Sequence, residues 1–181
     1  MRLILKRKRP RRKGAQAVCE DSRRTRLFNK TAMYYLKRKK SAKKPNKTAK
    51  RGLIEKLDRV FSRYIRLRDA LPGGYFRCIA CDRFKPIADA DCGHYHSRTH
   101  MATRYDEDNC HAECRHCNRF RADHLIGYRE NLIRKIGTPR YELLNSKAHT
   151  SKKWSEWELQ QLIAHYTEAV KSLEREKSIK L

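Results

Sequence analysis

Two Cys-x-x-Cys pairs are the residues whose spacing most clearly indicates chemistry. Cys78 and Cys81 form the first pair, Cys114 and Cys117 form the second, and 32 residues separate the pairs. Zinc prefers four thiolate or imidazole ligands in a tetrahedron, and a two-residue spacer lets both thiolates of a pair reach one ion. The spacing therefore predicts a structural Zn²⁺ held by these four cysteines.

The interval between the pairs is longer than the roughly 15–20 residues of a simple zinc ribbon. We expect it to hold a strand and a long loop. His111 and His116 lie beside the second pair and could compete as ligands, although the spacing favours four cysteines. The alternative is four buried free cysteines, which is disfavoured because so polar a chain has little apolar interior.

Polar residues in and beside this interval could hydrolyse a phosphodiester, a reaction that needs an activated water and charge neutralisation at the phosphate. His94 titrates near neutral pH and could take the proton of a water. Asp91 and Asn118 offer the oxygen ligands that Mg²⁺ or Mn²⁺ prefers. A lone histidine is more often structural, so a catalytic role for His94 is indicated only by the residues around it.

The order of these residues resembles the HNH nucleases, whose site is a two-stranded hairpin and a helix that grip one divalent metal ion. The resemblance implies that His94 is the general base and that Asn109 orients it through the backbone. It also implies that Asn118, directly after Cys117, helps to hold the metal ion.

The HNH nucleases usually place a second metal ligand directly before the base, where this chain has Gly93. Asp91 is the first substitute and His96 is the second. If residues 87–96 form a strand, His94 and His96 share a face and Asp91 lies on the other, unless Gly93 bends the chain.

Longer stretches resemble the phage NinG/Rap recombination endonuclease family. The resemblance covers roughly residues 57–175 and implies a metal-dependent, structure-specific DNA endonuclease that acts on branched recombination intermediates. Its matching stretches are residues 62–69, 93–95, 104–111, 114–118, 127–129 and 136–137.

The formal net charge is +25, and it is unevenly distributed. Residues 1–52 carry 21 Lys and Arg against only Glu20 and Asp21, whereas the remaining residues carry 24 against 18 acidic residues. This asymmetry favours a polyanionic partner such as DNA over a merely solvated basic tail. Six arginines are candidate phosphate contacts: Arg63, Arg66, Arg98, Arg104, Arg115 and Arg119.

Two other readings explain the charge and the cysteines. One is a non-catalytic, zinc-stabilised nucleic-acid-binding protein, and another is a basic RNA-associated protein. Neither explains why His94, Asn109 and Asn118 occur together at these positions.

The pattern of the chain predicts an α+β protein with a small zinc-stabilised core flanked by helices, and the resemblance implies that this core is of the HNH (ββα-metal) type. We expect a basic, partly disordered N-terminal arm over 1–52, a basic amphipathic helix over 53–74, the nuclease core over 75–121 and a helical extension over 122–181. Within these regions we expect strands over 75–80 and 87–96, a loop over 97–108 and helices over 109–120, 123–136 and from Ser155 onward.

Seven cysteines, an odd number, favour metal thiolates in a reducing compartment over a disulfide framework. The only apolar run near the first residue is Leu3-Ile4-Leu5, too short for a membrane span. We therefore expect a cytoplasmic protein with no membrane partner, in the host cell if the chain is phage-encoded. Paired cutting of a symmetric junction would need a homodimer.

Overall fold

The computed structural model describes residues 47–181. The predicted basic arm over 1–52 therefore lies almost wholly outside the described residues. The described part mixes helices with two small sheets, which confirms the α+β class. None of its helices has the length and apolar character needed to cross a bilayer.

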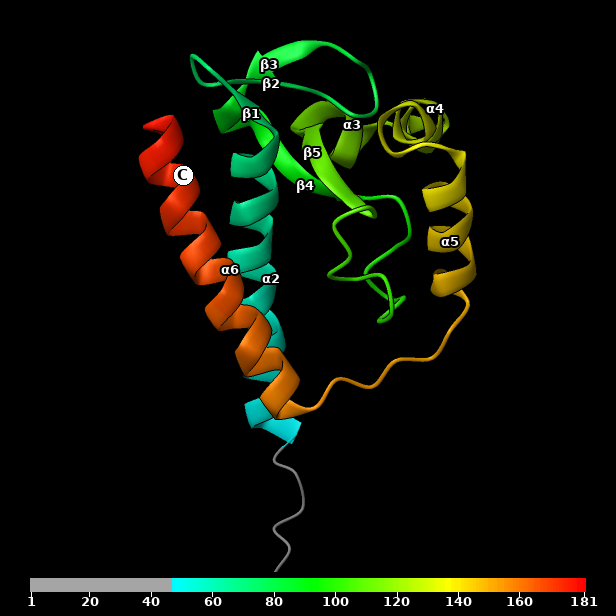
Figure 1. Cartoon of the computed structure of the whole chain (residues 1–181). Coiled ribbons are helices and arrows are strands. Elements are labelled where there is room, and N and C mark those ends of the chain that lie inside the picture. Colours follow the sequence, from blue (N-terminus) through cyan, green and yellow to red (C-terminus); the bar gives the residue numbers. More distant parts are fainter. Residues whose placement is uncertain (1–46) are drawn as a thin grey trace, which may run out of the picture. The chain divides into compact units, whose positions relative to one another are not determined.

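Two long helices run side by side and parallel along one flank of this part (Figure 1). They are α2 (Lys47–Asp69) and α6 (Glu156–Lys177). Leu57, Phe61 and Ile65 recur at helical spacing on α2 and are buried against the apolar stripe of α6. The rings of Phe61 and Tyr166 meet edge to face, with centroids 4.9 Å apart.

Hydrogen bonds from nearby side chains cap the start of α6 and the end of α2. The side chain of Ser155 accepts a hydrogen bond from the Glu158 backbone, which confirms the predicted capping box at the start of α6. At the other end, the Lys177 ammonium donates to the carbonyls of Leu67 and Arg68 in the last turn of α2 and to that of Ala70 just beyond it. The helix predicted over 53–74 begins earlier than expected, at Lys47, and ends earlier, at Asp69.

A three-stranded antiparallel sheet follows α2. It consists of β1 (Ala70–Leu71), β2 (Tyr75–Arg77) and β3 (Phe84–Pro86), in that order. The first cysteine pair lies in the turn between β2 and β3, so the strand expected over 75–80 ends earlier, at Arg77. This turn is the first of the two segments that bring cysteines together.

The second sheet is a hairpin of β4 (Ala90–His94) and β5 (Cys110–Cys114), preceded by the 3₁₀ turn η2 (Ile87–Asp89) and followed by the short helix α3 (Arg115–Phe120). The expected helix over 109–120 was therefore wrong for its first half. All five β5 residues are buried, including the polar His111 and Glu113. Pairing with β4, from Ala90–Cys114 to His94–Cys110, holds this segment as a strand, and such a long-range partner cannot be read from the sequence.

Two further helices pack on the core. Helix α4 (His124–Ile136) confirms the one expected over 123–136, whereas α5 (Thr138–Ala148) was not predicted. A Cβ on Gly127 of α4 would lie 2.2 Å from the Ala80 carbonyl oxygen, so a glycine is required where α4 crosses the cysteine turn.

Helix α2 is fixed to the hairpin by polar contacts at its C-terminal end. The Asp69 carboxylate accepts a hydrogen bond from the Ala112 backbone at 2.8 Å, and Arg68 donates to the Cys110 carbonyl at 2.8 Å. These contacts set the position of α2 along the strand that leads to the second cysteine pair.

Candidate active site and metal centre

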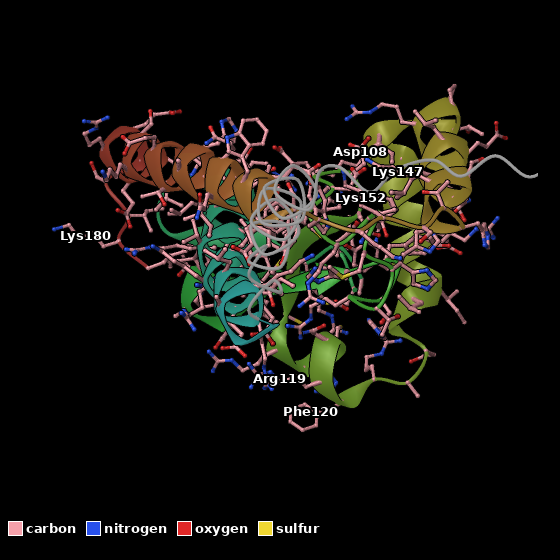
Figure 2. The ribbon with its side chains drawn as sticks, turned by 90° about the horizontal axis from the view of Figure 1, so that it is seen from below. Asp108, Arg119, Phe120, Lys147, Lys152 and Lys180 are labelled. Carbon is pink, nitrogen blue, oxygen red and sulfur yellow. The ribbon has the colours of Figure 1, made fainter. Side chains whose placement is uncertain are left out.

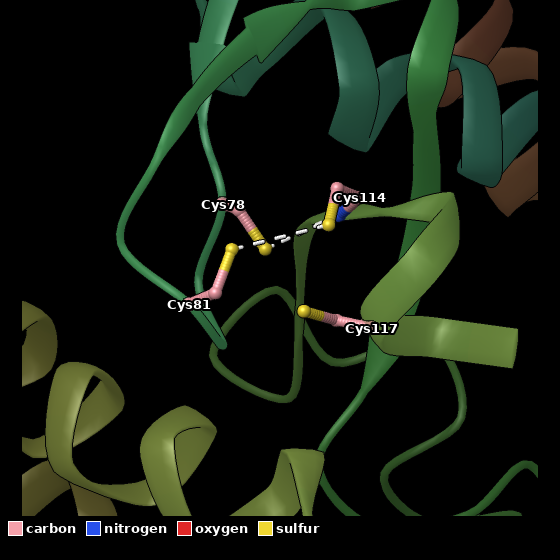
Figure 3. Close-up of side chains that lie close together, drawn as sticks. All are labelled: Cys78, Cys81, Cys114 and Cys117. Atoms are coloured by element: carbon pink, nitrogen blue, oxygen red, sulfur yellow. Dashed lines mark hydrogen bonds between the residues drawn. The ribbon is translucent and has the colours of Figure 1, made fainter. Parts of the chain in front are cut away.

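The four predicted cysteines come together from the β2–β3 turn, the end of β5 and helix α3 (Figure 3). Their sulfur atoms all lie within 4.8 Å of one another. The Cys81 and Cys114 sulfurs are 3.9 Å apart, and the Cys114 backbone donates to the Cys78 sulfur at 3.2 Å. Four converging sulfurs fit a tetrahedral ion, so this group could hold a metal such as zinc.

The backbone of the turn prepares this geometry. Asp82 adopts a left-handed φ of 60°, and its N–H donates to the Cys78 carbonyl at 2.9 Å. Burial raises the pKa of the Cys78 thiol to about 12, so a bound cation would have to displace the proton, as metal–thiolate sites do. Neither histidine that could compete joins the group. The buried His111 lies 3.4 Å from Asp69, and the exposed His116 lines a pocket beside Cys81, Cys114 and Cys117 without belonging to the four-sulfur group.

A polar cleft of about 460 Å³ lies between α2, β4 and α3. It brings together His94, Asp91 and Asn118, three residues that the sequence proposed for one site. The full lining is Asp58, Ser62, Asp91, Cys92, His94, Arg98, Asn118 and Arg119.

The Asp91 carboxylate is held from α3. Asn118 donates to it at 3.1 Å, and Arg119 donates to both of its oxygens, at 2.7 and 2.8 Å. Burial alone would raise the pKa of Asp91, but the hydrogen bonds from Arg119 and Asn118 outweigh it, and the pKa lies below the ordinary value. The Asp91 carboxylate is therefore ionised at neutral pH, and its oxygens can act as ligands to a cation.

His94 ends β4, and its Nδ1 lies 3.2 Å from the Cys92 carbonyl. Burial and the positive charge of Arg98 lower the pKa of His94, although the nearby carbonyls of Cys92 and Arg104 act in the opposite direction. The ring is consequently neutral at pH 7 and keeps one nitrogen lone pair. A neutral imidazole is the form that a general base requires.

Asn109 does not line the cleft, because its side chain is fully buried. Its oxygen accepts the His96 N–H at 2.7 Å, and its amide donates to the carbonyls of His96 and Thr103, both at 3.0 Å. The Tyr128 hydroxyl bridges the carbonyls of Gly93 and Asn109 at 3.1 and 3.2 Å. Together these contacts close the loop that follows His94.

His96 lies away from the cleft. Its Nε2 is 2.9 Å from the Asn145 oxygen on α5, and it lines a different groove, with Tyr95 and residues of α4. The strand ends at His94, so the alternation that would have put both histidines on one face does not reach residue 96.

Only two of the six candidate arginines, Arg98 and Arg119, line the cleft. Arg104 is tied to Asp58 at 2.5 and 3.0 Å, and Arg63 pairs with Glu174 at 2.5 Å. The other two donate to backbone carbonyls: Arg66 to Ser62 at 3.3 Å and Arg115 to Ala88 at 2.8 Å.

Phe120 is a residue that sequence reasoning missed. It follows Arg119 at the end of α3, and its side chain is 77% exposed. Figure 2 shows Arg119 and Phe120 projecting from the same end of the ribbon. Its position after Asn118 and Arg119 was a usable signal, but exposure cannot be read from sequence.

The comparisons with known proteins agree on one family. The family model described as "Bacteriophage Lambda NinG protein" matches residues 4–176. No solved structure matches the chain.

Three curated relatives, each called "Protein ninG", match over 129 residues and 69% of this chain. The one from Escherichia phage 933W is 33% identical and covered over 60% of its length. Those from Salmonella phage P22 and Escherichia phage lambda are 33% and 32% identical, and each is covered over 59%. The matched region thus spans about 60% of the relatives' length.

Proposed function

The chain belongs to the bacteriophage NinG family, and we propose that it is a metal-dependent endonuclease that hydrolyses phosphodiester bonds in branched DNA. The observation that carries this proposal is the convergence of His94, Asp91 and Asn118 on one polar cleft. The three residues come from two separate elements, β4 and α3, and two of them are already hydrogen-bonded to each other.

In this proposal His94 takes a proton from the attacking water. Its lowered pKa keeps the ring neutral, and the buried Asn109 and Tyr128 hold the backbone on either side of it. Asn109 therefore acts as a positioning residue for the segment that carries the base.

Asp91 and Asn118 would supply oxygen ligands to Mg²⁺ or Mn²⁺, which would neutralise the phosphate and stabilise the leaving oxygen. The residues fit, because Mg²⁺ commonly takes one or two protein carboxylates together with waters and phosphate oxygens. Asn118 now presents its NH₂ group to Asp91, so its amide would turn to offer the oxygen.

Arg119 has two uses in the same site. In the structure its guanidinium neutralises Asp91, yet its side chain is 53% exposed and can move. A cation on Asp91 would replace that neutralising charge and release Arg119 toward a phosphate, alongside Arg98. The other candidate arginines are held by protein groups.

The group of four cysteines would hold a structural zinc ion. It joins the β2–β3 turn to the start of α3, and α3 carries Asn118 and Arg119. The zinc would thereby fix the helix half of the cleft against the strand half.

The charge and the exposed aromatic side chain indicate the substrate class. A net charge of +25 suits a polyanion. Phe120, exposed beside Arg119, could stack on an unpaired base, which a branched DNA offers and an intact duplex does not.

A panel of fork, junction, loop and linear DNAs tests the function. With Mg²⁺ or Mn²⁺ the protein should cut branched DNA, and EDTA should stop the reaction. Binding to every DNA without cutting any of them would instead support the alternative, a non-catalytic zinc-stabilised nucleic-acid-binding protein.

A further inference from the structure

A second group of possible metal ligands lies at the other end of the β4–β5 hairpin from Cys114 and shares no residue with the cysteine centre. It consists of Cys92, His94 and Cys110, whose ligand atoms all lie within 4.8 Å of one another. Cys92 and His94 share one face of β4 because they are two residues apart, and Cys110 is the partner of His94 on β5. The hairpin register thus brings the group together.

The donor set is two thiols and one imidazole. Thiolate ligands select zinc and similar soft ions, whereas Mg²⁺ and Mn²⁺ prefer oxygen. Three such ligands leave one tetrahedral position open, as in zinc sites that keep a water. That position has access to solvent, because Cys92 and His94 line the cleft while Cys110 is fully buried.

We propose that Cys92, His94 and Cys110 form a second zinc site, and that zinc bound there inhibits the chain. Zinc would replace the two thiol protons, which pass to solvent, and would occupy the nitrogen lone pair of His94. The ring could then no longer accept a proton from water. The inhibition rests on the proposed function, but the binding site does not.

Metal stoichiometry tests the site without any assay of activity. The full-length protein, stripped of metal, reloaded with Zn²⁺ and passed through a desalting column, should retain two zinc ions per chain by mass spectrometry of the metal. The Cys92→Ser variant should retain one. Cys92 is the residue to change because it is only partly buried, whereas Cys110 is fully buried.

Cys19→Ser is the matched control for the loss of one thiol, and it should retain two ions. A wild-type chain that retains a single zinc ion overturns the proposal, whether or not the variant folds. Retention of two ions by a folded Cys92→Ser variant overturns it as well.

Inhibition is tested by measuring the rate of DNA cleavage in Mg²⁺ at increasing concentrations of Zn²⁺. Zinc should inhibit the wild type at a concentration at least about tenfold lower than it inhibits Cys92→Ser. Equal inhibition of both would overturn the inhibitory role. Absence of cleavage in every metal would refute the nuclease function and leave the stoichiometry to decide the zinc site.

Discussion

The Glu113 carboxylate fills the space that a side chain on Gly93 would need. A Cβ built on Gly93 would lie 2.3 Å from Glu113 Oε2 and 2.8 Å from Glu113 Cβ. The two residues are not direct partners in the hairpin, where Gly93 pairs with His111 and Asp91 with Glu113. Glu113 is fully buried, and its other oxygen lies 2.6 Å from His124 on α4. The residue before His94 therefore cannot supply a metal ligand, and Asp91 is the carboxylate of β4 that lines the cleft.

Gly93→Ala should lower the free energy of unfolding by about 1–3 kcal/mol, because an added methyl group meets a packed carboxylate and strand. Urea denaturation followed by circular dichroism measures the change. Gly52→Ala is the control, since Gly52 lies in α2 with no atom within 4 Å of an added Cβ.

The control should stabilise the protein by about 0.5–1 kcal/mol, the usual advantage of alanine over glycine inside a helix. If Gly93→Ala unfolds at the same urea concentration as wild type, the close approach of Glu113 does not limit this position.

Part of the site could be predicted from sequence because its signals are local. The spacing of the four cysteines predicted the metal-ligand group, and the Ser155–Glu158 capping-box pattern predicted the start of α6. Asp91 and His94 lie between the two cysteine pairs and Asn118 directly follows the second pair, so the sequence marked the three as candidates for one site. These inferences need no knowledge of which distant residues meet.

The differences from expectation have physical causes in particular residues. Arg104, a candidate phosphate contact, is paired with Asp58 on α2, a long-range contact that sequence does not show. Gly137 and Pro139 signal the end of α4, and the same proline, in the first turn of α5, also permits a helix to begin. Glu113 was not singled out from the sequence, and only its packing in the folded hairpin shows that it excludes a side chain at Gly93.

Asp69→Asn should destabilise the protein by about 3 kcal/mol near neutral pH, because it leaves buried donors without their charged partner. Asp69 accepts from Ala112 and contacts Arg68 and Lys135. Burial would raise its pKa, but hydrogen bonds from His111 and Arg68 outweigh this and hold it well below the ordinary 3.8.

Because the folded-state pKa of Asp69 lies below its unfolded value, this stabilisation is present above about pH 3.8 and is lost as the pH falls further. Urea unfolding near pH 7 and near pH 2 should show a smaller difference between wild type and variant at the acid pH. Lys171→Ala, which removes an exposed ion pair with Glu168, should change stability by less than about 0.5 kcal/mol. A similarly small effect of Asp69→Asn would contradict the structural role of this contact.

Cys117→Ser should remove one zinc ion per chain and abolish cooperative thermal unfolding of residues 75–121, because structural zinc supplies folding free energy directly. Calorimetry with metal analysis measures both effects, and a strong chelator should reproduce them on wild type. Cys19→Ser should leave both unchanged. A Cys117→Ser chain that unfolds at the wild-type temperature would show that the four thiols do not hold a structural ion.

Phe120→Ala should weaken binding to a fork or junction by about tenfold, in line with the loss of one base–aromatic stack. Binding to linear duplex should change little, because paired bases are already stacked. Fluorescence anisotropy measures both affinities. Trp157→Ala, which removes another exposed aromatic side chain from α6, is the control and should bind both DNAs like wild type. Equal losses on both DNAs would contradict the stacking role.

The most direct test of the central claim is nicking of a fork or junction DNA in Mg²⁺ or Mn²⁺ by wild type, His94→Ala and His165→Ala. His165 is an exposed histidine on α6 and controls for the loss of an imidazole. We expect wild type and His165→Ala to nick at the same rate, and His94→Ala to be slower by at least about 100-fold with DNA affinity unchanged. Nicking by His94→Ala at the wild-type rate would contradict the assignment of this residue as the base.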